Sequence, residues 1–213
     1  MNTKCWLFDF DGTLVDSMPT WAGIHMQALC DAGIPVPEDF VETITPLGNY
    51  NASKYTLSLG VKESLEDYLE RVSRVLYEEY TTNIKLKPHV REILSSLKAQ
   101  GVRLQVLTAS PHLYVDVCLK RLGVYEWFEH VWSIDDFGLT KAQPEIYVEA
   151  AKRLDLLPGK CTMVDDNFTA LSTAKKAGLC TVAIYDESAK SSEQAMRDMA
   201  DVYVYDYAEI YGK

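Results

Sequence analysis

The sequence lacks an excess of positive charge. Its 213 residues include 21 Lys and Arg against 31 Asp and Glu, which gives a net charge of −10. Nucleic acids and anionic membrane surfaces are bound chiefly by clustered Lys and Arg side chains. The composition therefore argues against nucleic acid or a membrane as a main partner. It leaves room for a small anionic substrate held by a few local cations.

Long apolar runs and paired cysteine motifs are also lacking. No apolar run reaches the roughly 18 residues of a membrane span, and the chain enters the strand-like stretch CWLFDF at once, so we expect no signal peptide. The five cysteines are widely spaced and form no C-x-x-C motif. Such cysteines are typical of free thiols in a reducing compartment. These absences predict a cytoplasmic protein.

The second half of the chain alternates between strand-like and helix-like patterns. The predicted strands span residues 102–108, 130–134, 161–166, 180–185 and 201–207, and the predicted helices span residues 88–100, 111–123, 144–156 and 168–178. Alternation of this kind is typical of a parallel sheet with helices on both faces. We therefore predict an α/β fold whose first strand is CWLFDF, residues 5–10.

A helical stretch separates this first strand from the alternating half. Residues 25–33 predict a helix that ends at a glycine, and residues 64–80 have apolar side chains with a period near 3.6. Ser64, with Asp67 three residues later, resembles a capping box. We predict a core domain of residues 1–15 and 86–213, and a helical domain of residues 16–85 inserted after the first strand.

Two acidic residues follow the first strand in the sequence LFDFDGTLV. Asp9 and Asp11 are two positions apart, and Gly12 allows the backbone to turn sharply after them. Since Phe10 would point to the opposite side of a strand, the two carboxylates could share one face. Ligands of open α/β sheets bind at the carboxyl ends of the strands. The pair is therefore a candidate site.

Other polar residues follow the remaining strands. Thr108 ends one strand, Asp165 and Asp166 end another, and Lys141 precedes a predicted helix. Clustered carboxylates need a cation, and oxygen ligands without His or Cys suit Mg²⁺ or Ca²⁺. Backbone N–H groups at the helix start near Pro111 could bind phosphate oxygens. The set predicts a Mg²⁺-dependent phosphoryl-transfer site.

Four stretches carry a family resemblance, namely DFDGTLVDS, VLTAS, KAQP and VDDNFTALSTAKKAG. In this order they resemble the four motifs of the haloacid dehalogenase superfamily of phosphatases. The helical insertion resembles the cap of its phosphoglycolate phosphatases and β-phosphoglucomutases. The resemblance implies a Rossmann-like sheet with a helical cap domain.

The resemblance also implies catalytic roles. Asp9 would be the nucleophile that forms an aspartyl-phosphate, and Asp11 would be the general acid and then the base. Mg²⁺ would bind an oxygen of Asp9, the backbone carbonyl of Asp11 and Asp166. Counting back from Gly178 places Asp166 on the family's metal-binding Asp. Asp165 is then an outer or shared ligand, and the choice between the two stays open.

The remaining motifs imply substrate contacts. Thr108, Ala109 and Lys141 would bind the phosphate, although Ala142 replaces a proline that is usual in the third motif. In the insertion, residues 45–55 could face the site and select the substrate, or could form a plain surface loop. Within that segment Tyr50, Asn51 and Lys54 are candidates for contacts with the leaving group, and we expect hinges near residues 17–19 and 84–88.

The sequence therefore predicts a hydrolase that removes phosphate from a small-molecule phosphate ester, as a monomer or a weak dimer. An alternative is a sugar phosphate mutase of the β-phosphoglucomutase type. Such mutases usually carry an Arg in the segment that corresponds to residues 45–55, and its absence here disfavours this alternative. A second alternative is a non-catalytic phospho-acceptor module like a receiver domain. In such modules an acidic pair comes first in the chain and no cap is present. Here the acidic pair, Asp165 and Asp166, comes last.

Overall fold

The computed structural model describes residues 3–210, and the chain divides into two compact units. The core unit comprises Met1–Asp16 and Lys85–Lys213, and the inserted unit comprises Ser17–Ile84. The sequence-based boundaries, at residues 16 and 85, differ from this division by one residue at each crossing.

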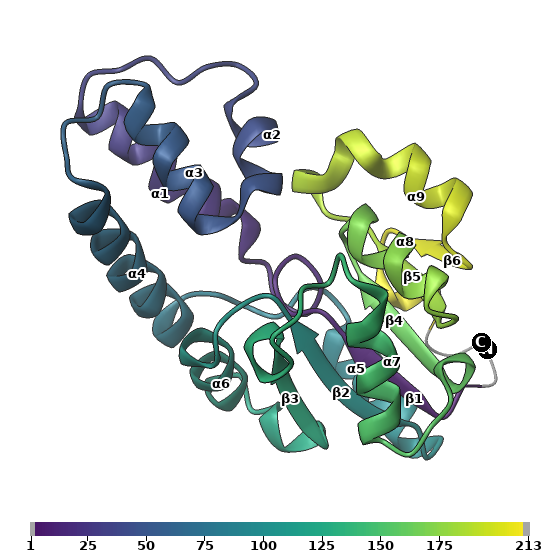
Figure 1. Ribbon diagram of the computed structural model, residues 1–213. Helices are drawn as coiled ribbons and strands as arrows, with labels where there is room; N and C mark the ends of the chain where they lie inside the picture. The colour runs from purple at the N-terminus through teal and green to yellow at the C-terminus, as the bar shows by residue number, and fades with distance from the viewer. Residues whose placement is uncertain (1–2, 211–213) are drawn as a thin grey trace. The chain divides into compact units, whose positions relative to one another are not determined.

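The core unit contains a six-stranded parallel sheet (Figure 1). The strand order is β3-β2-β1-β4-β5-β6. The strands are β1 (Cys5–Phe8), β2 (Arg103–Thr108), β3 (His130–Ser133), β4 (Cys161–Asp165), β5 (Cys180–Ile184) and β6 (Val202–Val204). Every residue of β1 and β4 is buried, as expected for central parallel strands covered on both faces. The predicted α/β, Rossmann-like fold is confirmed.

Helices cover both faces of this sheet. They are α5 (Val90–Ala99), α6 (His112–Arg121), α7 (Pro144–Arg153), α8 (Phe168–Lys176) and α9 (Glu193–Met199), followed by the short turn η6 (Tyr207–Glu209). Residues of α7, α8 and α9 pack in one cluster with Leu7 and Met163. On the other face, the ring of Phe8 lies 6.5 Å from those of Phe128 and Tyr207. Helix α9 was not predicted from the sequence.

The inserted unit consists of helices joined by loops and, within the described residues, has no strand. Its helices are α1 (Met18–Asp31), α2 (Phe40–Ile44), α3 (Gly48–Ser58) and α4 (Leu65–Thr82), with the short turn η1 (Thr45–Leu47) before α3. Helix α4 begins as predicted, because the Ser64 hydroxyl accepts the backbone N–H of Asp67 at 3.1 Å. Helix α1 starts seven residues before the predicted position, since Pro19 is tolerated in a first helical turn.

Two chain segments join the units, and they pair with each other inside the core unit. Val15 and Leu86 form an antiparallel bridge. The Asp16 N–H donates to the Lys85 carbonyl at 2.9 Å, and the Lys87 N–H donates to the Leu14 carbonyl at 3.0 Å. These bonds fix both segments up to the limits of the inserted unit, which fall inside the predicted hinges at residues 17–19 and 84–88.

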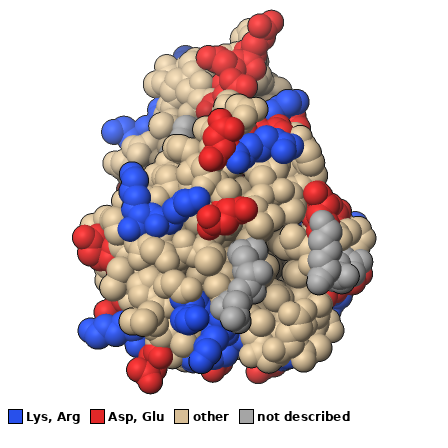
Figure 2. Space-filling model, turned by 90° about the vertical axis from the view of Figure 1, so that its right-hand side faces the viewer, with Lys and Arg blue, Asp and Glu red and all other residues tan. Residues whose placement is uncertain are grey.

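Figure 2 shows Lys and Arg side chains interleaved with Asp and Glu side chains on the face that it presents. Among the described residues, no helix combines the length and apolar character needed to cross a membrane. All five cysteines are free thiols, as the sequence predicts.

Candidate active site

The turn that follows β1 carries Asp9 and Asp11. Because β1 ends at Phe8, strand alternation does not set the directions of these side chains as the sequence suggested. Asp9 Oδ1 lies 2.7 Å from Lys141 Nζ, whereas the Ser110 hydroxyl donates a hydrogen bond to the Asp11 carboxylate. The two carboxylates therefore have different partners on the same rim of the sheet.

Lys141 connects the first strand to the acidic pair. Its ammonium lies 2.7 Å from both Asp9 Oδ1 and Asp165 Oδ2, and its side chain is only 11% exposed. Burial alone opposes the charge, but the carboxylates of Asp165 and Asp9 outweigh it and raise the pKa of Lys141. The Tyr147 hydroxyl lies 3.0 Å from the Lys141 carbonyl and supports the loop. Lys141 is thus a fixed cation at the site.

Asp165 and Asp166 differ in their surroundings. Asp165 Oδ2 pairs with Lys141, and Oδ1 accepts the Asn167 N–H at 2.8 Å, so both oxygens are engaged. Asp166 Oδ1 accepts the Thr13 hydroxyl at 2.9 Å. Burial raises the pKa of Asp165 to about 7, and burial together with the charges of Asp165 and Asp9 raises the pKa of Asp166. Negative charge on either of these two acids is therefore unfavourable in the folded protein.

Gly12 lies directly against Asp166. Its φ is +69°, and a Cβ atom at this position would lie 2.5 Å from Asp166 Oδ2. This backbone conformation disfavours residues other than glycine, and the Cβ atom of any such residue would displace the Asp166 carboxylate. The stretch DFDGT, residues 9–13, thus requires glycine at position 12 for two separate reasons.

The three buried carboxylates have the composition of a cation site. One oxygen each from Asp9, Asp165 and Asp166 lies within 4.8 Å of the others. Asp9 Oδ1 accepts no hydrogen bond from the described residues, although the Lys141 ammonium is within ion-pair distance. One ammonium does not balance three carboxylates, and oxygen donors suit Mg²⁺ or Ca²⁺. The residues therefore fit a divalent metal ion.

The segment after β2 forms the other side of the rim. Thr108 is buried, and its hydroxyl accepts the Ser110 N–H at 3.1 Å. Ala109 lies between them, and α6 starts two residues after Ser110. His112, in the first turn of α6, pairs with Asp116 at 3.2 Å and with a second carboxylate, that of Asp136, at 2.9 Å.

The candidate substrate residues of the insertion lie on a helix. Tyr50, Asn51 and Lys54 belong to α3, so residues 45–55 are helical and do not form a loop. Lys54 Nζ lies 5.6 Å from the centre of the Tyr50 ring, and the Asn51 amide donates to the Leu47 carbonyl at 3.2 Å.

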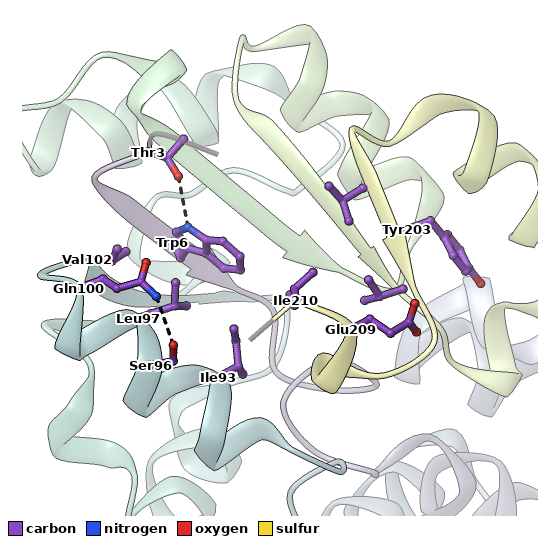
Figure 3. Close-up of a pocket in the computed structure, with 12 residues that line it drawn as sticks. Thr3, Trp6, Ile93, Ser96, Leu97, Gln100, Val102, Tyr203, Glu209 and Ile210 are labelled. Carbon is purple, nitrogen blue, oxygen red and sulfur yellow. Dashed lines mark hydrogen bonds between the residues drawn. The ribbon is translucent and has the colours of Figure 1, made fainter. Parts of the chain in front are cut away.

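A cavity of about 500 Å³ lies elsewhere in the core unit (Figure 3). Trp6, Leu97 and Val102 help to line it, and Val102 immediately precedes β2, at the amino ends of the strands. Its acidic residue, Glu209, already accepts the N–H groups of Tyr205 and Asp206. No predicted site residue lines this cavity, so it is not the candidate active site.

Comparison with known proteins agrees with this geometry. The family model of the haloacid dehalogenase-like hydrolases matches residues 3–178. The chain belongs to this family. The prediction that the chain is a hydrolase of the haloacid dehalogenase superfamily is confirmed.

Individual relatives cover most of the chain. The phosphorylated carbohydrates phosphatase of Thermotoga maritima is 28% identical over 174 residues, which are 81% of each chain. A phosphoglycolate phosphatase of Salmonella choleraesuis is 30% identical over 206 residues, 86% of this chain and 81% of that protein. The crystal structure of a predicted phosphoglycolate phosphatase from Haemophilus somnus has a TM-score of 0.81 and 25% identity, and the match covers 99% of this chain and 97% of that one.

Several residues that shape the rim were not identified from the sequence. Ser110 donates a hydrogen bond to Asp11, and Thr13 donates one to Asp166. Both stand inside the quoted motifs, next to predicted site residues, and this position could have indicated their role. Lys87 also reaches the turn after β1, but it belongs to no motif, and only the fold brings it there.

Proposed function

We propose that this protein is a Mg²⁺-dependent phosphatase that hydrolyses a small phosphate monoester through an aspartyl-phosphate on Asp9. The proposal is supported chiefly by one observation, namely that Asp9 meets Lys141 and the acidic pair at the carboxyl ends of β1 and β4. A nucleophile, a fixed cation and a metal-binding set are thus available within one rim.

Asp9 and Asp11 would divide the chemistry between them. An Asp9 oxygen attacks phosphorus, the bond from phosphorus to the leaving oxygen breaks, and protonated Asp11 gives its proton to that oxygen. Asp11 then takes a proton from water, which attacks phosphorus and releases Asp9 and inorganic phosphate. The hydrogen bond from Ser110 would hold Asp11 in the required direction throughout.

The charge of the substrate requires positive partners. Mg²⁺, held by Asp9, the Asp11 carbonyl and Asp166, would supply charge stabilisation for the phosphoryl group. Asp165 would remain paired with Lys141, because both of its oxygens are engaged in the structure. This difference favours Asp166 as the direct ligand.

The phosphate oxygens would be bound by side chains and backbone. Lys141 would contribute its ammonium, and Thr108 and Ala109 would contribute hydroxyl and backbone N–H groups beside the start of α6. The names of the two phosphatase relatives support a small organic phosphate as substrate. The inserted unit would act as the cap that selects the leaving group, with Tyr50, Asn51 and Lys54 as candidate contacts, and the enzyme would work in the cytoplasm.

The test is a comparison of substrates with purified protein. We expect Mg²⁺-dependent release of phosphate from p-nitrophenyl phosphate and from some members of a panel of sugar phosphates and phosphoglycolate. Activity should vanish with EDTA and return with Mg²⁺. Values of kcat/KM should be far lower for a phosphopeptide and a 5′-phosphorylated oligonucleotide.

The same assay separates the alternatives. A mutase would return the phosphoryl group to sugar and release little phosphate. A phospho-acceptor module would show a single turnover without sustained release. A clear preference for either macromolecular substrate would contradict the small-substrate proposal.

A further inference from the structure

Lys87 lies in the segment that follows the inserted unit, and its side chain is only 12% exposed. Its ammonium donates to the Gly12 carbonyl at 2.7 Å, to the Tyr185 carbonyl at 2.7 Å and to Asp186 Oδ2 at 2.9 Å. An ammonium has three N–H donors. All three are therefore used on oxygens of the core unit, in contrast to an ordinary surface lysine.

The Gly12 carbonyl is part of the turn that carries the catalytic acids. The Gly12 N–H donates to the Val15 carbonyl at 3.0 Å, which fixes the Asp11–Gly12 peptide and with it the direction of the Asp11 carbonyl. The contact with Lys87 fixes the next peptide, between Gly12 and Thr13. Two successive peptide planes of the turn are thus held.

A second buried side chain supports the same turn. The Tyr207 hydroxyl donates to the Thr13 carbonyl at 3.2 Å, and Tyr207 is fully buried. The Thr13 hydroxyl in turn donates to Asp166 Oδ1. The carbonyls of Gly12 and Thr13 are therefore both held by side chains from distant parts of the chain, and the turn's own hydroxyl holds a carboxylate of the acidic pair.

We propose that Lys87 is a positioning residue of the metal site. By holding the Gly12 carbonyl it orients the turn that presents the Asp11 carbonyl and the Thr13 hydroxyl. The inference rests on the Mg²⁺-dependent activity proposed above. Lys87 acts through the peptide of Gly12 and not by contact with reacting atoms.

Loss of Lys87 would also change the charge near the metal site, and a more negative site would by itself favour Mg²⁺. Lys87 also pairs with Asp186, so its loss would leave an unpaired negative charge near Asp166. A set of variants separates the two effects: Lys87→Met, Asp186→Asn and the double variant. The double variant removes both members of the buried pair, a change that proteins often tolerate. Lys85→Met is the matched control, because Lys85 is exposed on the same segment.

The measurement is the titration of each purified full-length variant with MgCl₂ by isothermal calorimetry. We expect Lys87→Met to weaken Mg²⁺ binding by about tenfold or more, the range typical of residues that support metal ligands. The double variant should bind Mg²⁺ more weakly than Asp186→Asn by a similar factor. Lys85→Met should bind Mg²⁺ with the affinity of the wild type.

Equal Mg²⁺ affinity of the double variant and Asp186→Asn would overturn the positioning role. If Lys87→Met does not fold, as judged by circular dichroism, this pair decides alone. Calorimetry requires no turnover, so the two proposals can fail separately. A wild type that binds Mg²⁺ but hydrolyses no ester contradicts the proposed function only, and a wild type that binds no Mg²⁺ contradicts both.

Discussion

The core unit and the inserted unit treat their buried polar groups in opposite ways. In the core unit, Asp9, Asp165 and Asp166 bring three carboxylates beside the ammonium of Lys141. In the inserted unit, His25 is a buried titratable group that is only 1% exposed. Its neighbours are hydroxyls of α4 and α3, and burial, aided by the charge of Arg71, lowers its pKa to about 4.

This difference separates chemistry from packing. Uncompensated carboxylates destabilise a fold, so their retention at one rim indicates a site that gains its balance from a ligand. His25 is neutral at pH 7, and its Nδ1 lies 2.9 Å from the Tyr68 hydroxyl and 3.2 Å from that of Thr56. The inserted unit thus keeps its buried His25 uncharged, in contrast to the acidic rim of the core unit. Variants in each unit can test the two sides of this comparison.

The largest effect on stability is expected at Lys141. Lys141→Met leaves the carboxylates of Asp9 and Asp165 without their buried cation, and should lower the free energy of unfolding by about 3–5 kcal/mol. Urea unfolding in EDTA measures this effect. The control is Lys152→Met, because Lys152 is 78% exposed and pairs with Glu149 at the surface. Equal losses in the two variants would contradict the account of the site.

The inserted unit should respond to acid through His25. Because its folded-state pKa is lowered from 6.5 to about 4, only the unfolded chain binds this proton between those values. The associated stability is complete above pH 6.5, and up to about 3 kcal/mol is lost as the pH falls to 4. The His25→Gln variant should lose correspondingly less than the wild type when both are unfolded by urea at pH 7 and pH 4.5. Identical pH dependence would show that His25 is not kept neutral by burial.

Gly12 provides a smaller and more local test. Gly12→Ala would force the Asp166 carboxylate to move, and we expect kcat/KM to fall about 100-fold, as misplaced catalytic groups typically cause. The control is Gly33→Ala, since Gly33 has the same φ of +69° and a Cβ added there would meet no atom within 4 Å. Both variants share the backbone strain, so comparable kinetic losses would exclude a specific effect on Asp166.

The smallest expected difference lies within the acidic pair. Asp166→Ala should raise the Mg²⁺ concentration needed for half-maximal activity by about tenfold more than Asp165→Ala does. The reason is that Asp165 is already committed to Lys141 and to the Asn167 N–H. The opposite order would make Asp165 the direct ligand.

The sequence predicted those parts of the molecule in which local pattern and tertiary structure agree. β2 and α4 are found within two residues of their predicted bounds, and α4 has both a periodic pattern and a cap. β1 starts where predicted but ends at Phe8, two residues before the predicted end. α2 and α9 were missed because they are short, and α3 was missed because its pattern of polar and apolar residues gives little indication of a helix.

The site shows the same limit. The order of motifs along a parallel sheet was enough to bring Asp9, Lys141 and the acidic pair to one rim. The separate directions of Asp9 and Asp11 were not predictable, because they depend on where β1 ends and on a serine from another loop. Lys87 was not predictable for a similar reason, because its partners are distant in sequence.

The central claim is that Asp9 carries the phosphoryl group, and acid quenching during turnover tests it most directly. Wild-type protein, mixed with Mg²⁺ and its best substrate and quenched with acid, should gain the mass of one phosphoryl group on the peptide that contains Asp9. Asp9→Asn should keep the fold, gain no such mass and lose turnover. Steady turnover in Asp9→Asn, or a phosphoryl group mapped to another residue, would contradict the account.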